Sequence, residues 1–351
     1  MASQNEARSD PRLNRFGATQ TYARTARLAN AVLSRSFGAP VRCPFQMGVH
    51  SSHRLIFMSD ERYITETLFD ELGFRMSFAA ERIVFQGKGD LQSLVLFENK
   101  RFGRMLMLDG ATQVTTADEF IYSEMMSHVP ILAHGSCEDV LIIGGGDCLI
   151  AEEVLKHKGV RHCVQVEIDK AVLDFSKEYF LEWNRPFFED KRVESVIADG
   201  MHYVADRRNH GRFDVIIVDS TDPQGPGAVL FSREFYEGAK SCLKGGGIMV
   251  TQNGVPFFQP EELSSTIGIW RDLFSDPYAY IAAIPTYVGG HMTMGFATDD
   301  KALRAVPLST LEERFRSAKF STRYYTPEVH RAAFALPRFI RDLVEKARGK
   351  S

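Results

Sequence analysis

The segment F-D-V-I-I-V-D over residues 213–219 places the strongest limit on how this chain can fold. Its apolar run ends directly at Asp219, and Asp222 follows in a loop rich in proline and glycine. Such a run is typical of a buried strand in a parallel sheet, which carries the next residues to the carboxyl edge, where α/β proteins build their sites. Two carboxylates there suit a cationic ligand and disfavour phosphate. The alternative is a strand followed by an ordinary acidic turn.

Predicted strands and helices alternate from residue 139 onward, which is the pattern of an open, mostly parallel sheet with helices on both faces. The helices are expected over 148–157, 171–180 and 235–243, the last closed by the glycines 245–247. The strands, some with the loop that follows, are expected over 140–147, 163–169, 193–200, 213–219, 248–254, 281–285 and 295–298.

Residues 58–117 are predicted to form a small antiparallel β domain ahead of this region. The runs 91–99, 104–110 and 111–116 read as a meander with glycines at the turns. Asp118 is placed to cap a helix whose apolar side is supplied by Phe120, Met125, Val129 and Leu132. The larger domain is therefore expected to span 118–351.

Residues 1–57 differ from the rest of the chain. They contain eight arginines and no lysine, and Glu6 and Asp10 are their only acids. This composition leaves three interpretations open: a disordered extension, an upstream start codon with the true domain opening at Met58, or an organellar transit peptide. We expect the segment to be a disordered extension that lies outside the catalytic fold.

Composition excludes several classes of function. A formal net charge of −3 over 351 residues gives no basic field for nucleic acid or an anionic membrane, and no apolar stretch approaches the roughly 18 residues of a membrane span. Five scattered cysteines without C-x-x-C spacing predict neither a disulfide framework nor a zinc site, and favour the reducing cytoplasm. His128, His157 and His291 lack metal-ligand spacing and are expected at the surface or at helix caps. No metal is expected.

The loop G-G-G-D over 144–147 resembles a nucleotide-binding turn, and Glu167 follows Asp147 by twenty residues, the spacing at which a carboxylate meets ribose hydroxyls. Leu149 holds the place of the third glycine of G-x-G-x-x-G. A carboxylate at Asp147 would repel a pyrophosphate and attract an ammonium or sulfonium group. The turn therefore indicates an adenosine ligand without phosphates, of the S-adenosyl kind. Asp199, followed by Gly200, either binds the adenine amino group or caps a helix.

With these motifs in order, the chain resembles the spermidine synthase (polyamine aminopropyltransferase) family over nearly all of residues 58–351. The segments that carry the resemblance are F-G-R-M-L-M-L-D-G (102–110), D-E-F-I-Y-S-E-M-M (118–126), L-I-I-G-G-G-D (141–147), V-E-I-D (166–169), D-G (199–200), D-S-T-D-P-Q-G-P (219–226), F-Y-E-G-A-K (235–240), T-Q-N-G (251–254) and A-I-P-T-Y-V-G-G (283–290). The resemblance implies an α/β fold: a Rossmann-like, methyltransferase-type parallel sheet with a small N-terminal antiparallel β domain, assembled as homodimers or homotetramers.

The activity implied is aminopropyl transfer from decarboxylated S-adenosylmethionine, a co-substrate, to putrescine, giving spermidine and 5′-methylthioadenosine. No prosthetic group is implied. By the same resemblance, Asp219 would take the proton of the acceptor amine and Tyr122 would orient that amine. Asp147 and Asp222 would hold cationic amino groups. The diamine channel would also include Ser123, Gln252 and Tyr287, and the nucleoside would be surrounded by Gln92, Leu108, Asp147, Glu167, Asp199, Gly200 and Pro226.

Alternatives stay open for individual residues and for the activity. Both tyrosines could be packing residues, and Gln92 could face solvent. The chain departs from the family at Cys148-Leu149 after the glycine loop, at Glu152 where an arginine is common, at Leu91 where an aromatic is usual, and at Ser123 where His or Gln is common. These departures bear on cofactor affinity and amine length. A methyltransferase of the same superfold, and a catalytically silent polyamine-binding relative, are the competing hypotheses.

Overall fold

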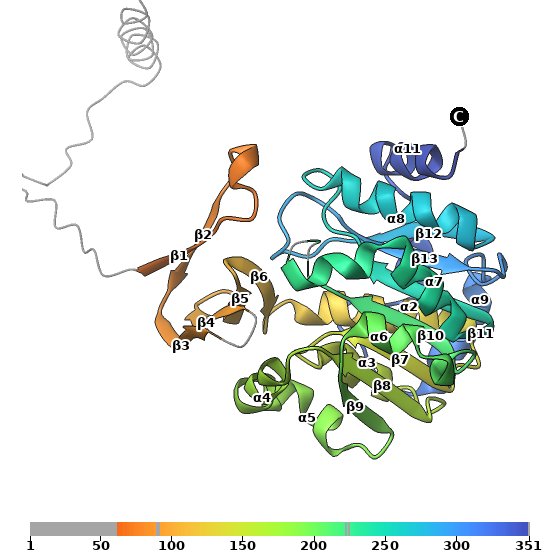
Figure 1. The fold of residues 1–351 in the computed structure, drawn as a ribbon, viewed down its shortest axis with the longest axis horizontal. Helices are drawn as coiled ribbons and strands as arrows, with labels where there is room; N and C mark the ends of the chain where they lie inside the picture. The colour runs from red at the N-terminus through yellow and green to blue at the C-terminus, as the bar shows by residue number, and fades with distance from the viewer. Residues whose placement is uncertain (1–61, 89–91, 222, 224, 350–351) are drawn as a thin grey trace, which may run out of the picture. The chain divides into compact units, whose positions relative to one another are not determined.

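The computed structural model describes residues 62–88, 92–221, 223 and 225–349 (Figure 1). The prediction of an extension over 1–57, the role given to Asp222 and the departure at Leu91 all fall outside the described residues. Among the described helices, none combines the length and apolar character needed to cross a bilayer.

A seven-stranded sheet forms the centre of the larger domain, in the order β12-β13-β11-β10-β7-β8-β9. The five strands from β11 to β9 are parallel to one another, whereas β13 pairs antiparallel with β11 and with β12. The strand bounds are β7 (Asp139–Gly144), β8 (His162–Glu167), β9 (Val193–Ile197), β10 (Phe213–Asp219), β11 (Leu243–Gln252), β12 (Asp276–Ala282) and β13 (Met292–Thr298). The expected mostly parallel, Rossmann-like sheet is confirmed.

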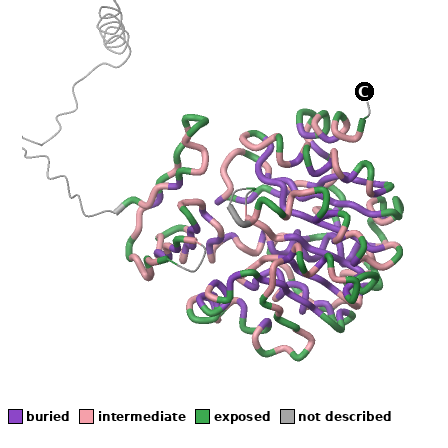
Figure 2. The backbone as a smooth tube through the Cα atoms, in the orientation of Figure 1, coloured by how far each residue is buried: buried purple, intermediate pink, exposed green. Residues whose placement is uncertain are grey.

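Apolar packing covers both faces of this sheet, and all its strands except the edge strand β9 are buried along most of their length (Figure 2). Side chains alternate along β10: Val215 and Ile217 join one core cluster, while Ile216 and Val218 join the other. The helices are α2 (Glu119–His134), α3 (Leu149–Leu155), α4 (Lys170–Tyr179), α5 (Leu181–Glu189), α6 (Gly200–Ala205), α7 (Arg233–Cys242), α8 (Pro260–Leu273), α9 (Leu308–Ala318), α10 (Pro327–Ala333) and α11 (Arg338–Ala347).

The N-terminal region is antiparallel β, as predicted. A two-stranded ribbon of β1 (Arg62–Glu66) and β2 (Met76–Ala80) precedes a four-stranded meander of β3 (Arg82–Lys88), β4 (Ser93–Asn99), β5 (Gly103–Leu108) and β6 (Ala111–Thr115). The meander packs its apolar face against the larger domain, where Leu96 and Leu106 share a cluster with Leu149 and Phe180. This packing explains a leucine at position 149: its side chain, at the start of α3, fills the contact between the meander and the helices of the larger domain.

Three local expectations differ from the structure. Helix α7 ends at Cys242, and the glycines 245–247 lie inside β11, at an irregularity in its pairing with β10. Asp118 occupies the N-cap position of α2 without making a side-chain cap hydrogen bond. His128 and His157 are buried rather than at the surface, because their rings hydrogen-bond each other at 2.9 Å and Glu153 lies 3.1 Å from His128 Nε2.

Candidate active site

Four strand ends bring carboxylates to one edge of the central sheet. Asp147 follows β7, Glu167 ends β8, Asp199 follows β9 and Asp219 ends β10. All four line one cavity of about 220 Å³. Seven other residues that were predicted from the sequence to form the site also line the cavity: Gln92, Leu108, Tyr122, Ser123, Gly200, Gln252 and Tyr287. Pro226 falls in the 3-10 helix η3 (Gly225–Phe231).

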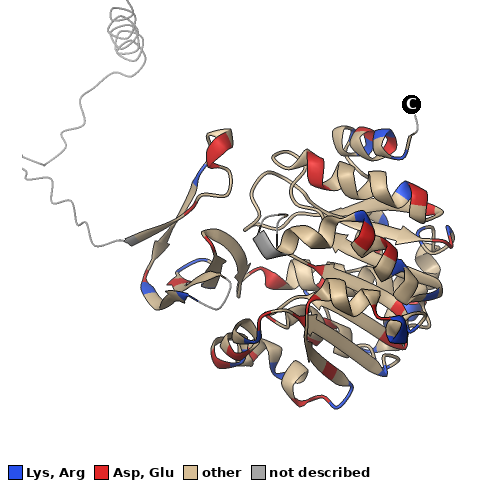
Figure 3. Ribbon diagram, viewed as in Figure 1, with Lys and Arg blue, Asp and Glu red and all other residues tan. Residues whose placement is uncertain are grey.

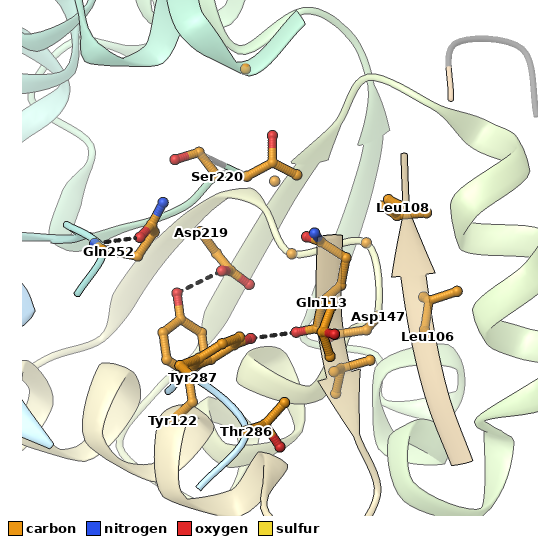
Figure 4. Close-up of a pocket in the computed structure, with 18 of the residues that line it drawn as sticks. Leu106, Leu108, Gln113, Tyr122, Asp147, Asp219, Ser220, Gln252, Thr286 and Tyr287 are labelled. Carbon is orange, nitrogen blue, oxygen red and sulfur yellow. Dashed lines mark hydrogen bonds between the residues drawn. The ribbon is translucent and has the colours of Figure 1, made fainter. Parts of the chain in front are cut away.

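Asp219 and Tyr122 face each other in this cavity (Figure 4). The Tyr122 hydroxyl donates a 2.7 Å hydrogen bond to Oδ1 of Asp219. Burial, and then the charge of Asp147, raise the pKa of Asp219 to about 8, while the hydrogen bond from Tyr122 acts in the opposite direction. A carboxyl group with this pKa can both lose and accept a proton near neutral pH, which is what a general base requires.

The glycine loop and the end of β10 touch through their backbones. Gly144 has φ +82°, and a Cβ there would lie 2.1 Å from the carbonyl oxygen of Asp219, so only glycine fits. The amide of Gly145 donates to that same oxygen at 3.0 Å. This contact fixes the spacing between the loop that carries Asp147 and the strand that carries Asp219.

Asp147 is held by its own neighbours. Its Oδ1 accepts a 3.0 Å hydrogen bond from the amide of Leu149, and the side-chain amide of Asn184 donates to its backbone carbonyl at 2.8 Å. Burial raises the pKa of its carboxyl group. The next residue, Cys148, has φ +65°, a conformation that favours glycine. The departure noted at this position is therefore accommodated with backbone strain.

On the side of the cavity predicted to bind the nucleoside, Glu167 and Asp199 are both fixed by backbone donors. Glu167 Oε1 accepts from the amide of Asp169 at 2.9 Å, and burial raises the pKa of Glu167 to about 7. Asp199 accepts from the amide of Met201 at 2.8 Å and so caps α6, while also lining the cavity. Helix capping and a ligand-facing position are thus compatible for Asp199.

Two tyrosines form one wall of the cavity. The rings of Tyr122 and Tyr287 meet edge to face with centroids 6.2 Å apart. The Tyr287 hydroxyl donates to the backbone carbonyl of Gln113 in β6 (Figure 4). Gln252 is likewise held, because its Oε1 accepts from the amide of Gly254 at 2.9 Å. The wall is therefore held in place by contacts within the protein.

All the charged side chains that line the cavity, among the described residues, are acidic. Among the described residues that line it there is no Lys, Arg or His, whereas the acids are Glu66, Asp118, Glu119, Asp147, Glu167, Asp169, Asp199 and Asp219. Acidic and basic side chains are otherwise interspersed over the larger domain (Figure 3). The excess of carboxylates is thus a property of the cavity, and it favours cationic ligands.

Sequence reasoning missed several lining residues. Glu119 lies on α2 three residues before Tyr122 and so shares its face of the helix, a spacing that could have identified it. Burial raises the pKa of Glu119 to about 8. Gln113 and Thr286 also line the cavity, as do apolar residues of the β1–β2 ribbon and its connection: Leu68, Phe69, Phe74 and Met76. No local pattern singles out this apolar group.

Comparison with known proteins places this site in a family. A model of the spermine/spermidine synthase domain matches residues 119–306, and a model of the spermidine synthase tetramerisation domain matches 64–116. The polyamine aminopropyltransferase of Pseudomonas syringae pv. tomato is 49% identical over 282 residues, which cover 80% of this chain and 97% of that protein. The chain belongs to the spermine/spermidine synthase family.

Other family members agree with this assignment. The polyamine aminopropyltransferase of Ruegeria sp. is 50% identical over 82% of this chain and 99% of its own length. Two crystal structures share the fold with TM-scores of 0.75. One is a spermidine synthase in complex with the transition-state analogue AdoDATO (32% identity, 86% of this chain, 98% of that chain), and the other is from Thermotoga maritima (33%, 82% and 95%). The chain is accordingly a transferase of polyamine biosynthesis.

Proposed function

We propose that the chain transfers the aminopropyl group of decarboxylated S-adenosylmethionine to putrescine, giving spermidine and 5′-methylthioadenosine. The cavity lined by acids, with no basic side chain among the described lining residues, is the observation that carries this proposal. The donor brings a sulfonium and an ammonium, and the acceptor brings two ammonium groups. A phosphorylated or carboxylated ligand would instead meet like charge on several sides.

The reaction needs one proton transfer and one displacement. Putrescine nitrogens have Lys-like pKa values of about 10, so the attacking nitrogen arrives as an ammonium and must first lose a proton. In the proposal that proton passes to Asp219, and Tyr122 holds the Asp219 carboxylate in place. The nitrogen lone pair then forms a bond to the carbon next to sulfur. The carbon–sulfur electrons return to sulfur, which leaves as a neutral thioether and needs no acid catalyst.

The remaining residues take the roles that the family resemblance implies. Glu167 would accept hydrogen bonds from the ribose, and Asp199 with Gly200 would meet the adenine. Gln92, Leu108 and Pro226 would complete the nucleoside site. Asp147 would pair with the ammonium of the aminopropyl arm, whereas Asp222 would hold the acceptor together with Ser123, Gln252 and Tyr287. Similarity to a spermidine synthase bound to AdoDATO supports an S-adenosyl-type donor.

We also propose that the chain is an oligomer and that it acts in the cytoplasm. The match of residues 64–116 to a spermidine synthase tetramerisation domain supports oligomerisation, and we infer a homodimer or homotetramer. The four described cysteines are free thiols, which agrees with a reducing compartment such as the cytoplasm.

Mass spectrometry of the reaction products tests the assignment of donor and acceptor. Purified protein would be incubated with decarboxylated S-adenosylmethionine and, separately, putrescine, cadaverine or spermidine. We expect spermidine as the main product, from putrescine. If the protein preferred another amine, that amine would be the acceptor in place of putrescine, and the reaction would still be aminopropyl transfer. Consumption of S-adenosylmethionine with release of S-adenosylhomocysteine would establish a methyltransferase instead.

A further inference from the structure

Asp118 occupies a helix N-cap position but does not cap the helix. Its backbone has φ −131° and ψ 2°, and its side chain accepts no hydrogen bond from the first turn of α2. An aspartate at this position normally contributes about 1 kcal/mol by capping. The carboxylate is only 5% exposed and turns toward other segments. The role of the Asp118 side chain therefore depends on the groups that hydrogen-bond to it.

The Asp118 carboxylate joins three segments of the chain. Oδ1 accepts from the Thr115 hydroxyl at 2.6 Å, at the end of β6. Oδ2 accepts both from the amide and from the hydroxyl of Thr286, at 2.8 and 2.5 Å. Thr286 is 168 residues away in sequence, in the connection between β12 and β13. Hydrogen bonds to a buried carboxylate are stronger than neutral ones, so this junction is a firm anchor.

The anchored connection carries the wall of the cavity. Tyr287 directly follows Thr286, and its hydroxyl donates to the Gln113 carbonyl in β6. Tyr287 is thus held on one side by its neighbour Thr286, which Asp118 binds, and at its hydroxyl by β6. The ring meets that of Tyr122 in an edge-to-face arrangement, with an interplanar angle of 78°. Tyr122 stands four residues after Asp118, on the same side of α2, and donates to Asp219.

We propose that Asp118 is a positioning residue for the amine channel: it anchors Thr286, and with it the ring of Tyr287, to the helix that carries Tyr122. The assignment of this wall to the amine channel rests on the proposed function, whereas the anchoring does not. Loss of the carboxylate frees the 284–288 connection, so the two tyrosine rings lose their fixed spacing. Amine affinity and alignment then fall, while the nucleoside side of the cavity is untouched.

Two variants of Asp118 separate positioning from general destabilisation. Asp118→Ala removes all three hydrogen bonds. Asp118→Asn keeps an oxygen for both Thr286 donors and turns its amide group to the Thr115 hydroxyl, which can accept. Asp206→Ala is the matched control, because Asp206 also holds an N-cap position and accepts from the Arg208 amide and guanidinium, but lies outside the cavity lining.

Steady-state kinetics with decarboxylated donor and putrescine, and calorimetric titration of 5′-methylthioadenosine, give the readout. For Asp118→Ala we expect KM for the amine to rise about 10-fold to 100-fold, as for a misplaced positioning group, with methylthioadenosine affinity within about twofold of wild type. Asp118→Asn should have an amine KM and a methylthioadenosine affinity close to those of wild type. Asp206→Ala should match wild type in both quantities. Equal losses of amine and nucleoside affinity in Asp118→Ala, or an unchanged amine KM, would refute the positioning role.

A crystal structure of Asp118→Ala keeps the test independent of the proposed function. If the wild-type protein transferred no aminopropyl group to any amine, the proposed function would fail while the anchoring claim stayed testable. The Tyr287 ring displaced from Tyr122 supports the claim. A ring still in its wild-type place overturns it.

Discussion

The hydroxyl of Tyr122 donates a 2.7 Å hydrogen bond to Oδ1 of Asp219, which lies ninety-seven residues later in the chain. One residue comes from the first helix after the β domain and the other from the carboxyl end of the central strand β10. The bond stabilises the charged form of a carboxyl group whose burial favours the neutral form. Both the neutral and the charged form of the proposed base are therefore populated near neutral pH.

Replacement of Asp219 by asparagine should abolish most turnover while the donor still binds. The amide cannot take the ammonium proton, and loss of a general base typically costs ~10²–10⁴ in rate. Turnover by mass spectrometry and 5′-methylthioadenosine binding by calorimetry would be compared with wild type. Near wild-type turnover at neutral pH would remove Asp219 from the role of base.

Tyr122→Phe should shift the pH dependence of the reaction. The hydrogen bond from Tyr122 lowers the pKa of Asp219. Its removal therefore raises that pKa, and a smaller fraction of Asp219 is ionised at neutral pH. We expect kcat/KM at pH 7 to fall about tenfold, the equivalent of ~1.4 kcal/mol, and to recover partly as the pH is raised. A pH–rate profile of both proteins decides this, since an equal loss at every pH would mean that Tyr122 acts on the amine alone.

Stability of the ligand-free protein should decrease as pH rises from about 6.5 to about 8, above the range in which the buried histidines, whose pKa values burial lowers, act in the opposite direction. Burial raises the pKa of Glu119 and Asp219 to about 8 and of Glu152 and Glu167 to about 7. In this window the folded protein holds protons that the unfolded chain has already released, so the free energy of unfolding falls with pH. Thermal unfolding at several pH values measures the trend. A dicationic amine should offset it, because ammonium groups pair with the carboxylates as they ionise. Stability that increased over the same range would show that these carboxyl groups do not govern it.

Asp147→Asn should weaken binding of the decarboxylated donor and narrow its advantage over S-adenosylmethionine. The carboxylate of ordinary S-adenosylmethionine repels Asp147, whereas the decarboxylated arm offers only an ammonium group. Affinity for the decarboxylated donor should fall about tenfold or more, since a hydrogen bond to a charged group contributes ~1.5–3 kcal/mol. Calorimetry with both donors and both proteins gives the ratio. An unchanged ratio would assign discrimination to cavity shape or to Cys148-Leu149.

The residues at strand ends could be predicted from the sequence because their signals are local. Apolar runs that stop at Asp219, Asp147 or Glu167 place each carboxylate at the same edge of a parallel sheet. The parts that escaped prediction depend on distant partners. The sequence pattern around Asp118 predicts a helix cap, whereas in the structure its carboxylate accepts hydrogen bonds from Thr286, 168 residues away.

Burial of histidine is equally a tertiary property. His128 and His157 show no pattern that separates surface from core, and burial lowers the pKa of His128 to about 3. Their burial follows from the packing of α2 against α3, which brings His128, His157 and Glu153 into contact with one another, and from Phe320, whose ring lies 4.8 Å from that of His128. The apolar residues that the β1–β2 ribbon contributes to the cavity could not be predicted for the same reason, because their position depends on tertiary packing.

The most direct test of the account is release of 5′-methylthioadenosine from decarboxylated S-adenosylmethionine, measured with and without putrescine in a single reaction series. The account predicts release that depends on putrescine and matches spermidine formed one for one. It also predicts that release disappears in Asp219→Asn. Release of 5′-methylthioadenosine at the same rate without putrescine, or none with it, would contradict the claim that this acidic cavity joins a sulfonium donor to an amine acceptor.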